Sequence, residues 1–294
     1  MSGTSGLGST VFAERRRRHT LYFLEWAARQ RPVHLDTEVD MTRVQRHRAA
    51  ARERGERYAV VSYLLYATGR ALARHPEANA VAATPWPAPL RAPRTVRFEG
   101  VTAKLALDRP VGPDAERTVL SALVPGLESA GLPAIQQRVE RYAGRYAAEL
   151  PEFQRVLKLG TLPALLGRAL FGAALRDPRR RPDIFGTVSV SSLGHRPVDG
   201  FHSAGGTAVT VCAGQIAERA VVRDGHVVPA PVMRLGLTFD HRVIDGATAA
   251  DVLGTLRHSL EDFDDGSWED ASRAHLRSTD HDLGSPGGLA PSPR

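Results

Sequence analysis

A histidine stands at the end of a predicted strand, and an aspartate follows it four residues later. In residues 235–239 the large apolar side chains fall on every second position, which predicts a strand with one buried face. His241 lies at the mouth of this strand, where a substrate can reach it. Its imidazole titrates near neutral pH and can therefore take up and release a proton. The alternative for His241 and Asp245 is a polar surface turn without a chemical role.

Hydroxyl side chains form a second candidate set earlier in the chain. Residues 186–194 read Gly-Thr-Val-Ser-Val-Ser-Ser-Leu-Gly, which predicts a strand with Thr187, Ser189 and Ser191 on one face. A hydroxyl group can donate a hydrogen bond to an oxygen that gains negative charge during a reaction. A hydroxyl in a strand can be such a donor, although most strand hydroxyls are only polar surface.

Three segments together resemble a known family. The sequence Asp-His-Arg-Val-Ile-Asp-Gly at residues 240–246 resembles the His-x-x-x-Asp-Gly motif of the CoA-dependent acyltransferases. With the strand at 186–194 and His-Pro-Glu-Ala-Asn at 75–79, the chain is similar to the catalytic domain of the 2-oxo acid dehydrogenase acyltransferases (dihydrolipoyl acyltransferases). The similarity covers most of residues 15–265 and is weakest over 108–180. Within that range, the strand at 110–125 lacks the family's usual glycine and proline positions.

The resemblance implies a fold and a set of residue roles. The fold would be α/β, a two-layer mixed β-sheet flanked by helices as in chloramphenicol acetyltransferase, in trimers with each active site between two subunits. His241 would be the general base, and Ser191 would donate its hydroxyl to the oxyanion, with Ser189 and Ser192 as the alternatives if the register shifts. Asp245 would polarise the site or hold the loop by pairing with an arginine such as Arg242.

We therefore expect a stand-alone CoA-dependent acyltransferase, which moves an acyl group between a thioester and an acceptor. The thioester would be acyl-CoA (coenzyme A as substrate) or an acyl group on a carrier protein, and no lipoyl group would be covalently attached. The expected assembly is a homotrimer or a larger assembly of trimers. Two alternatives stay open: the same scaffold used for cyclisation, dehydration or condensation, and a non-catalytic trimeric assembly subunit.

The composition restricts the other function classes. Of 294 residues, 42% are hydrophobic and 24% charged, as in globular proteins. The net charge of +7 suits anionic ligands such as the phosphates of CoA, and no zinc finger, aromatic–basic stacking motif or helix-turn-helix signal favours nucleic acid. His241 and Asp245 have no third metal ligand at a supporting spacing, so no metal is expected. The sequence contains no Gly-x-Ser-x-Gly motif, so a hydrolase with a serine nucleophile at such a turn is not favoured.

The single cysteine and the absence of a long apolar run bear on location. Cys212 excludes an intramolecular disulfide, and its apolar neighbours predict a packed thiol inside a strand. No transmembrane segment is evident, and charged residues interrupt the segment after the four arginines at 15–18, which excludes a twin-arginine export signal. We expect a cytoplasmic protein.

The elements around these residues follow from periodicity and helix-breaking residues. We expect a disordered N-terminal arm at 1–14, one catalytic domain at 15–265 and a polar, disordered tail at 266–294. Helices are predicted at 15–31, 41–54, 62–75 (with Ser62 as its N-cap), 133–148 and 247–263. Strands are predicted at 32–40, 95–98, 101–107, within 110–125, at 186–194, 207–213, 217–223 and 233–239, with an Asp-Gly hairpin turn at 224–225.

The segment 153–175 has the most unusual composition. It is densely apolar, carries cations along its length, and contains Gly160 and Pro163, which predict a break. We expect a core or subunit-interface helix in two pieces, with an acyl pocket or a membrane-surface segment as alternatives. The following Arg179, Arg180 and Arg181 are expected to form an exposed connector.

Overall fold

A mixed sheet forms the centre of the molecule in the computed structural model, which describes residues 17–83, 94–110, 117–143 and 146–264. Its six strands follow the order β1-β8-β7-β6-β4-β5. In chain order they are β1 (Pro32–Asp40), β4 (Ala103–Pro110), β5 (Arg117–Val124), β6 (Val188–Ser192), β7 (Val209–Arg223) and β8 (His226–Asp240). The expected arm at 1–14 and tail at 266–294 lie outside the described residues.

The strand pairing follows from the alternation seen in the sequence. β6 is parallel to both β4 and β7, whereas β1, β8 and β5 pair antiparallel with their neighbours. β7 and β8 form one long hairpin, and at its turn Asp224 and Gly225 have φ of 50° and 79°. Both residues of a type I′ turn require positive φ, which is why an Asp-Gly pair stands there.

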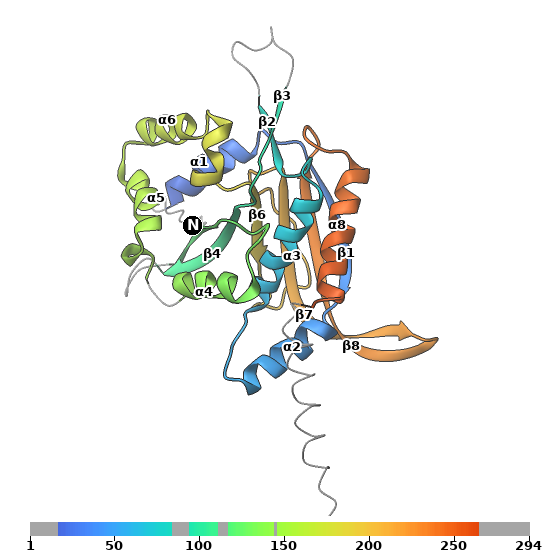
Figure 1. Ribbon diagram of the computed structural model, residues 1–294. Coiled ribbons are helices and arrows are strands. Elements are labelled where there is room, and N and C mark those ends of the chain that lie inside the picture. Colours follow the sequence, from blue (N-terminus) through green and yellow to red (C-terminus); the bar gives the residue numbers. More distant parts are fainter. Residues whose placement is uncertain (1–16, 84–93, 111–116, 144–145, 265–294) are drawn as a thin grey trace, which may run out of the picture.

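A helical layer covers one face of the sheet, where helices α3 (Val60–Arg74) and α8 (Gly246–Glu261) pack against each other (Figure 1). The hydrophobic core lies between this layer and the apolar face of the strands. α2 (Thr42–Glu53) packs on α8 at the end where the β7–β8 hairpin projects. Burial of these alternating apolar side chains is the main driving force for the fold.

The opposite, polar face of the sheet is covered by α1 (Arg18–Ala27), by the short helix α7 (Arg181–Ile184) and by the loop 193–208. Two glycines let the loop and the strands approach closely. A Cβ at Gly205 would lie 2.3 Å from the Ser189 Cβ, and one at Gly214 would lie 1.9 Å from the Asp199 carbonyl oxygen. The loop is therefore seated on β6 and β7.

The remaining elements lie beyond the β5 edge and at the ends of the sheet. They are β2 (Ala80–Ala83) and β3 (Arg94–Arg97), which form a separate two-stranded sheet, and α4 (Leu132–Ala143), η2 (Ala147–Glu149), α5 (Pro151–Thr161), α6 (Ala164–Ala174) and η3 (Pro178–Arg180). The expected α/β architecture, a mixed sheet flanked by helices, is confirmed, and so is the break between α5 and α6.

Three sequence-based details are wrong. Ser62 does not cap α3, which begins two residues earlier; its buried hydroxyl donates to Gln136 Oε1 at 2.6 Å and ties α3 to α4. The expected strands 207–213 and 217–223 are one strand with an irregularity between Ala213 and Ile216. The helix expected at 133–148 ends at Ala143 in α4.

Candidate functional site

His241 lies in the turn that joins β8 to α8, as the sequence indicates. Its backbone N–H donates to the Arg31 carbonyl at 2.9 Å, and its ring lies 5.5 Å from the Phe239 ring. The side chain is exposed, and none of the hydrogen bonds found among the described residues uses its ring nitrogens. The imidazole is therefore anchored by its backbone and open to a substrate.

The buried Asp240 carboxylate holds this turn in place. It is only 3% exposed and accepts hydrogen bonds from the Arg242 guanidinium, with Nε at 2.9 Å, and from the backbone N–H groups of Arg31 and Arg242. Burial by itself would raise the pKa of the Asp240 carboxyl, but these hydrogen bonds and the Arg242 charge outweigh it, so the pKa is lowered. Asp240 thus holds a charge that organises the residues on both sides of His241.

Asp245 does not form the ion pair with Arg242 that the sequence suggested. It is the N-cap of α8, and its Oδ1 accepts from the Thr248 N–H at 2.9 Å. Arg242 pairs with Asp240 instead. Hydrogen bonds from Thr248 lower the pKa of the Asp245 carboxyl, with a smaller contribution from the His241 charge. Asp245 therefore starts the helix that follows the histidine and lies within electrostatic reach of it.

The three serines of β6 differ in what their hydroxyls do. Ser189 is buried, donates to the Gly205 carbonyl at 2.9 Å and accepts from Thr207 Oγ1. Ser192 Oγ accepts from the Gly194 N–H at 3.3 Å. The Ser191 hydroxyl makes none of the hydrogen bonds found among the described residues, and Ser191 is half-buried. Ser189 therefore has its O–H engaged, whereas Ser191 and Ser192 can each still donate; Ser191 lies on the same face of β6 as Ser189 and Ser192 on the other.

Within one chain, Ser191 and His241 are far apart. Ser191 pairs with Cys212 of β7, which pairs with Gly236 of β8, five positions before His241. Five strand residues at about 3.3 Å each separate the two levels by about 17 Å, before the two strand spacings across the sheet are added. An oxyanion donor and a base must both lie about 3 Å from the reacting atoms. One chain therefore does not bring the two side chains to one substrate.

Two arginines near His241 were not predicted to lie there. Arg31, immediately before β1, donates its backbone N–H to the Asp240 carboxylate, and its carbonyl accepts from the His241 N–H, a pairing that no local pattern reveals. Arg181 was expected in an exposed connector but is only 7% exposed; it lies 4.9 Å from the Trp26 ring and donates to the Leu175 carbonyl. Burial lowers the pKa of Arg181 to about 10, and repulsion from the nearby Arg242 contributes.

Cys212 is buried in β7, and burial raises the pKa of its thiol to about 12, which confirms the packed thiol expected from the sequence. Among the described residues, no group of three or more His, Cys, Asp or Glu side chains is arranged to hold a metal ion.

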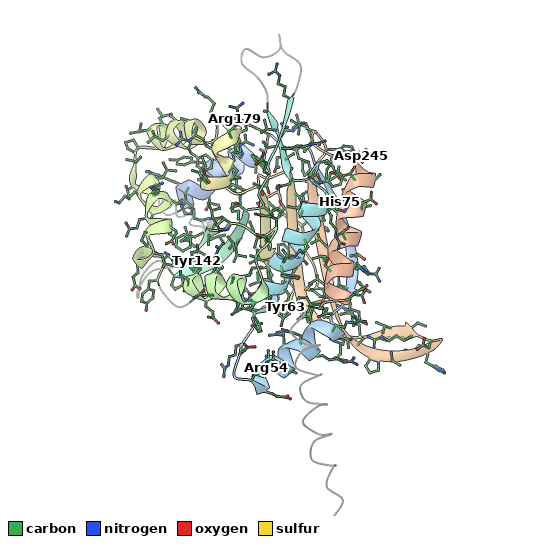
Figure 2. The ribbon with its side chains drawn as sticks, viewed as in Figure 1. Arg54, Tyr63, His75, Tyr142, Arg179 and Asp245 are labelled. Carbon is green, nitrogen blue, oxygen red and sulfur yellow. The ribbon has the colours of Figure 1, made fainter. Side chains whose placement is uncertain are left out.

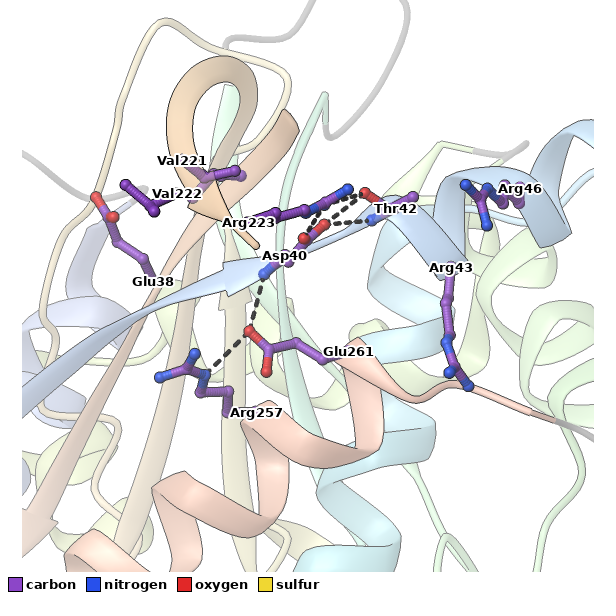
Figure 3. Close-up of a pocket in the computed structure, with 11 residues that line it drawn as sticks. Glu38, Asp40, Thr42, Arg43, Arg46, Val221, Val222, Arg223, Arg257 and Glu261 are labelled. Atoms are coloured by element: carbon purple, nitrogen blue, oxygen red, sulfur yellow. Dashed lines mark hydrogen bonds and ion pairs between the residues drawn. The ribbon is translucent and has the colours of Figure 1, made fainter. Parts of the chain in front are cut away.

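A polar pocket of about 520 Å³ lies at the other end of β8, at the base of the hairpin (Figure 3). It is lined by residues of β1, α2, β7, β8 and α8, and none of the three predicted site residues is among them. Its charged groups pair with one another: Arg223 binds Asp40, and Arg257 donates to Glu261 Oε1 at 3.0 Å. Asp245, beside His241, lies at the opposite end of the molecule from Arg54 of the α2 end (Figure 2). This pocket is therefore separate from the histidine site.

Comparison with known sequences matches the second half of the chain to one family. Residues 185–266 match the family model of the 2-oxoacid dehydrogenases acyltransferase catalytic domain. A segment of 49 residues is 57% identical to the dihydrolipoyllysine-residue acetyltransferase component of the pyruvate dehydrogenase complex of Bacillus subtilis (strain 168), and 47 residues are 47% identical to that of Staphylococcus aureus (strain Mu50). These segments are 17% and 16% of this chain and 11% of the length of each relative.

Solved structures match over a much larger part of the chain. A probable dihydrolipoamide acetyltransferase from Listeria monocytogenes superimposes with a TM-score of 0.62 at 16% identity, over 88% of this chain and 96% of its own. The cubic core of a pyruvate dehydrogenase multienzyme complex gives 0.61 at 18% identity, over 88% and 94%. The chain therefore has the fold of the 2-oxoacid dehydrogenase acyltransferase catalytic cores, and its residues 185–266 are similar in sequence to that family.

Proposed function

We propose that the protein is an acyltransferase that moves an acyl group between a thioester and an acceptor thiol, with His241 as general base and Ser191 as oxyanion donor. The observation that supports this most directly is that both side chains have polar groups free to bind a substrate. Both lie in the segment that matches the family, and both offer groups unused by hydrogen bonds among the described residues. The acyl donor would be acyl-CoA or an acylated carrier protein.

In the proposed reaction His241 first removes a proton and later returns it, and Ser191 stabilises the intermediate between these two steps. His241 takes the proton from the acceptor thiol, and the thiolate sulfur forms a bond to the thioester carbonyl carbon. The Ser191 hydroxyl donates a hydrogen bond to the tetrahedral oxyanion, which is worth about 3 kcal/mol at such positions. The intermediate then collapses, the original C–S bond breaks, and the departing thiolate takes the proton from His241.

The separation of Ser191 from His241 supports an active site shared by two copies of the chain. Their levels on the sheet differ by about 17 Å within one chain, so His241 of one copy would act with Ser191 of a neighbour. A closed ring of copies provides such a head-to-tail contact for every subunit. We propose a homotrimer as the smallest such assembly, and the cubic core is an assembly described for a structural relative.

Asp240 and Asp245 would act on the histidine indirectly. Asp240 holds the turn through Arg31 and Arg242, and Asp245 begins α8 immediately after it. Arg181, close to Arg242, keeps the surroundings cationic and so suits an anionic substrate such as CoA.

The test separates the products by chromatography and measures free CoA and acyl-dihydrolipoamide formed from acyl-CoA of several chain lengths with dihydrolipoamide as acceptor. His241→Ala should lower kcat/KM by about 10²–10⁴, and Ser191→Ala by about 10²–10³. Ser192→Ala is the matched control, because the side chain of Ser192 lies on the opposite face of β6 from that of Ser191, and it should stay within a few-fold of wild type. Unchanged transfer in His241→Ala with any acyl-CoA that the wild type uses would refute the proposal.

A further inference from the structure

The helix α6 turns its apolar face outward. Its residues Leu166, Ala169, Leu170 and Ala173 follow the i, i+3, i+4, i+7 spacing of a single helix face, and all four are exposed. Leu165 beside them is 81% exposed. In a helix of a globular protein such a stripe ordinarily faces the core. We call these five residues the outer face of α6; the core part of the sequence-based expectation for this segment is wrong for them.

The structure fixes α6 in this orientation. Gly167 is the residue of α6 that is buried, and a Cβ there would lie 2.8 Å from the Tyr22 hydroxyl oxygen of α1. The Phe171 ring lies 6.4 Å from the Tyr22 ring, and Arg168 forms a 2.6 Å ion pair with Glu25 of α1. α1 therefore holds the inner side of α6, and the leucines on the other side are left at the surface.

The exposed apolar surface continues onto α1. Leu21 and Leu24 of α1 are 46% and 49% exposed. Leu21 lies one helical turn before Glu25, which pairs with Arg168, and Leu165 lies one turn before Arg168 on α6. Leucines of both helices therefore flank the same ion pair. Contiguous apolar surface of this kind marks an interaction site.

Cations outnumber acidic residues around this surface, where the acidic residue of α1, Glu25, is already paired with Arg168. Residues 153–176 contain Arg155, Lys158, Arg168 and Arg176 but no Asp or Glu. Arg155 and Lys158 are exposed on α5, and Arg179 lies on the same side of the molecule as α6 (Figures 1 and 2). At the junction of α5 and α6, Arg18 donates to the Leu162 carbonyl at 3.0 Å, which brings the start of α1 there as well.

We propose that the outer face of α6, with Leu21 and Leu24 of α1, docks on the surface of an anionic lipid bilayer. Exposed leucines bordered by Lys and Arg are the pattern of helices that lie in the plane of a membrane surface. A second copy of this chain fits less well, because a symmetric contact through this face would bring the same cations together with no acid from 153–176 to meet them. α6 would lie flat, since among the described residues no helix is long and apolar enough to span a bilayer.

The first experiment measures sedimentation of the full chain with vesicles of phosphatidylcholine alone and with one part phosphatidylglycerol to two parts phosphatidylcholine. The proposal expects binding to the anionic vesicles and little to the neutral ones, with binding weakened by salt. The double variant Leu166→Asp/Leu170→Asp should weaken partition at least about tenfold, from the loss of two buried leucines. Val222→Asp/Val227→Asp is the matched control, since these hairpin valines are each 72% exposed and lie away from α6.

A second variant separates charge from apolar contact. Arg155→Glu/Lys158→Glu should abolish the preference for anionic vesicles, whereas Arg46→Glu/Arg52→Glu on α2 should leave it unchanged. Circular dichroism of every variant checks that the fold is retained. Absence of binding to anionic vesicles, or binding unchanged in the α6 variant, overturns the proposal. One further result would overturn the proposal: the wild-type protein forms an assembly that does not bind vesicles, and Leu166→Asp/Leu170→Asp dissociates that assembly. The outer face of α6 would then be a contact between copies of the chain.

A labelling experiment tests the same face without removing its leucines in pairs. Leu170→Cys carries an environment-sensitive fluorophore, and the buried Cys212 stays unlabelled in the folded protein. A blue shift on addition of anionic vesicles, absent for the same label on Val227→Cys, supports docking through α6. Equal responses at the two positions, or none, contradict it.

Discussion

At the residue scale, the side chains proposed to react with the substrate differ from the side chains that hold them in place. His241 and Ser191 present groups unused by hydrogen bonds among the described residues, whereas Ser189, Asp240 and Asp245 all form hydrogen bonds within the protein. Asp240 is buried with its guanidinium partner, and Asp245 caps a helix. This division allows each neighbour to be changed with an outcome distinct from loss of the base.

Asp240→Asn removes the charge that holds the turn. We expect a loss of about 2–3 kcal/mol in the free energy of unfolding, below the range for fully buried pairs because the Arg242 side chain is 39% exposed. The lowered pKa of Asp240 means that the wild-type contribution is present above the unfolded-state pKa and is lost as pH falls through the folded-state value. Urea unfolding at pH 7 and in acid measures both effects. A variant as stable as wild type at pH 7 would contradict this role.

Two substitutions of Asp245 test whether its carboxylate only caps α8 or also takes part in the chemistry. Asp245→Ala should lower the free energy of unfolding, because the Thr248 N–H loses its acceptor. Asp245→Asn keeps an effective N-cap and should unfold at nearly the wild-type temperature with thiol-transfer rates within a few-fold of wild type. If Asp245→Asn is stable but loses transfer as severely as His241→Ala, the carboxylate charge itself is part of the chemistry.

At the scale of elements, the polar face of the sheet depends on a buried amine. Lys104 of β4 is 7% exposed; its Nζ donates to the Gly205 carbonyl and lies 4.3 Å and 3.8 Å from the rings of Phe23 and Phe185. The lysine joins β4 to the loop 193–208, to α1 and to the end of α7. Burial lowers the pKa of Lys104 to about 7.

The Lys104 pKa predicts how stability changes with pH. Between pH 7 and the ordinary lysine value of 10.5 the unfolded chain binds more protons than the folded chain, so stability should rise as pH increases across this range. Lys104→Met should flatten that rise and stabilise the protein at pH 7 by on the order of 3 kcal/mol. Thermal unfolding between pH 6 and 10 tests this, and a wild-type profile that is flat or falls would contradict the buried amine.

Local patterns predict the strands and the position of His241, because alternation and a turn are properties of adjacent residues. The hydroxyl row of β6 also follows from alternation, but only the fold distinguishes Ser191 from Ser189 and Ser192. The contacts of Asp240 with Arg31 and of Lys104 with Gly205 join residues distant in sequence. The outward direction of α6 could not be predicted, since the same periodicity describes a core-facing helix.

At the scale of the whole molecule, the sheet order keeps the proposed donor and base on different levels. β6 lies two strands from β8, and the register sets Ser191 opposite the level of Gly236 rather than that of His241. In the proposed mechanism a complete site would therefore require two copies, one giving the histidine and the next giving the serine. The proposed assembly would then be part of the catalytic mechanism and not only of stability.

The most direct measurement mixes two inactive variants. His241→Ala and Ser191→Ala are expressed together in equal amounts and compared with each variant alone by the amount of acyl-dihydrolipoamide formed from acyl-CoA. If each site takes His241 from one copy and Ser191 from its neighbour, random mixing leaves about a quarter of the sites complete, and about a quarter of wild-type activity should return. Recovery in the mixture that does not exceed the separate variants would contradict a site shared between copies.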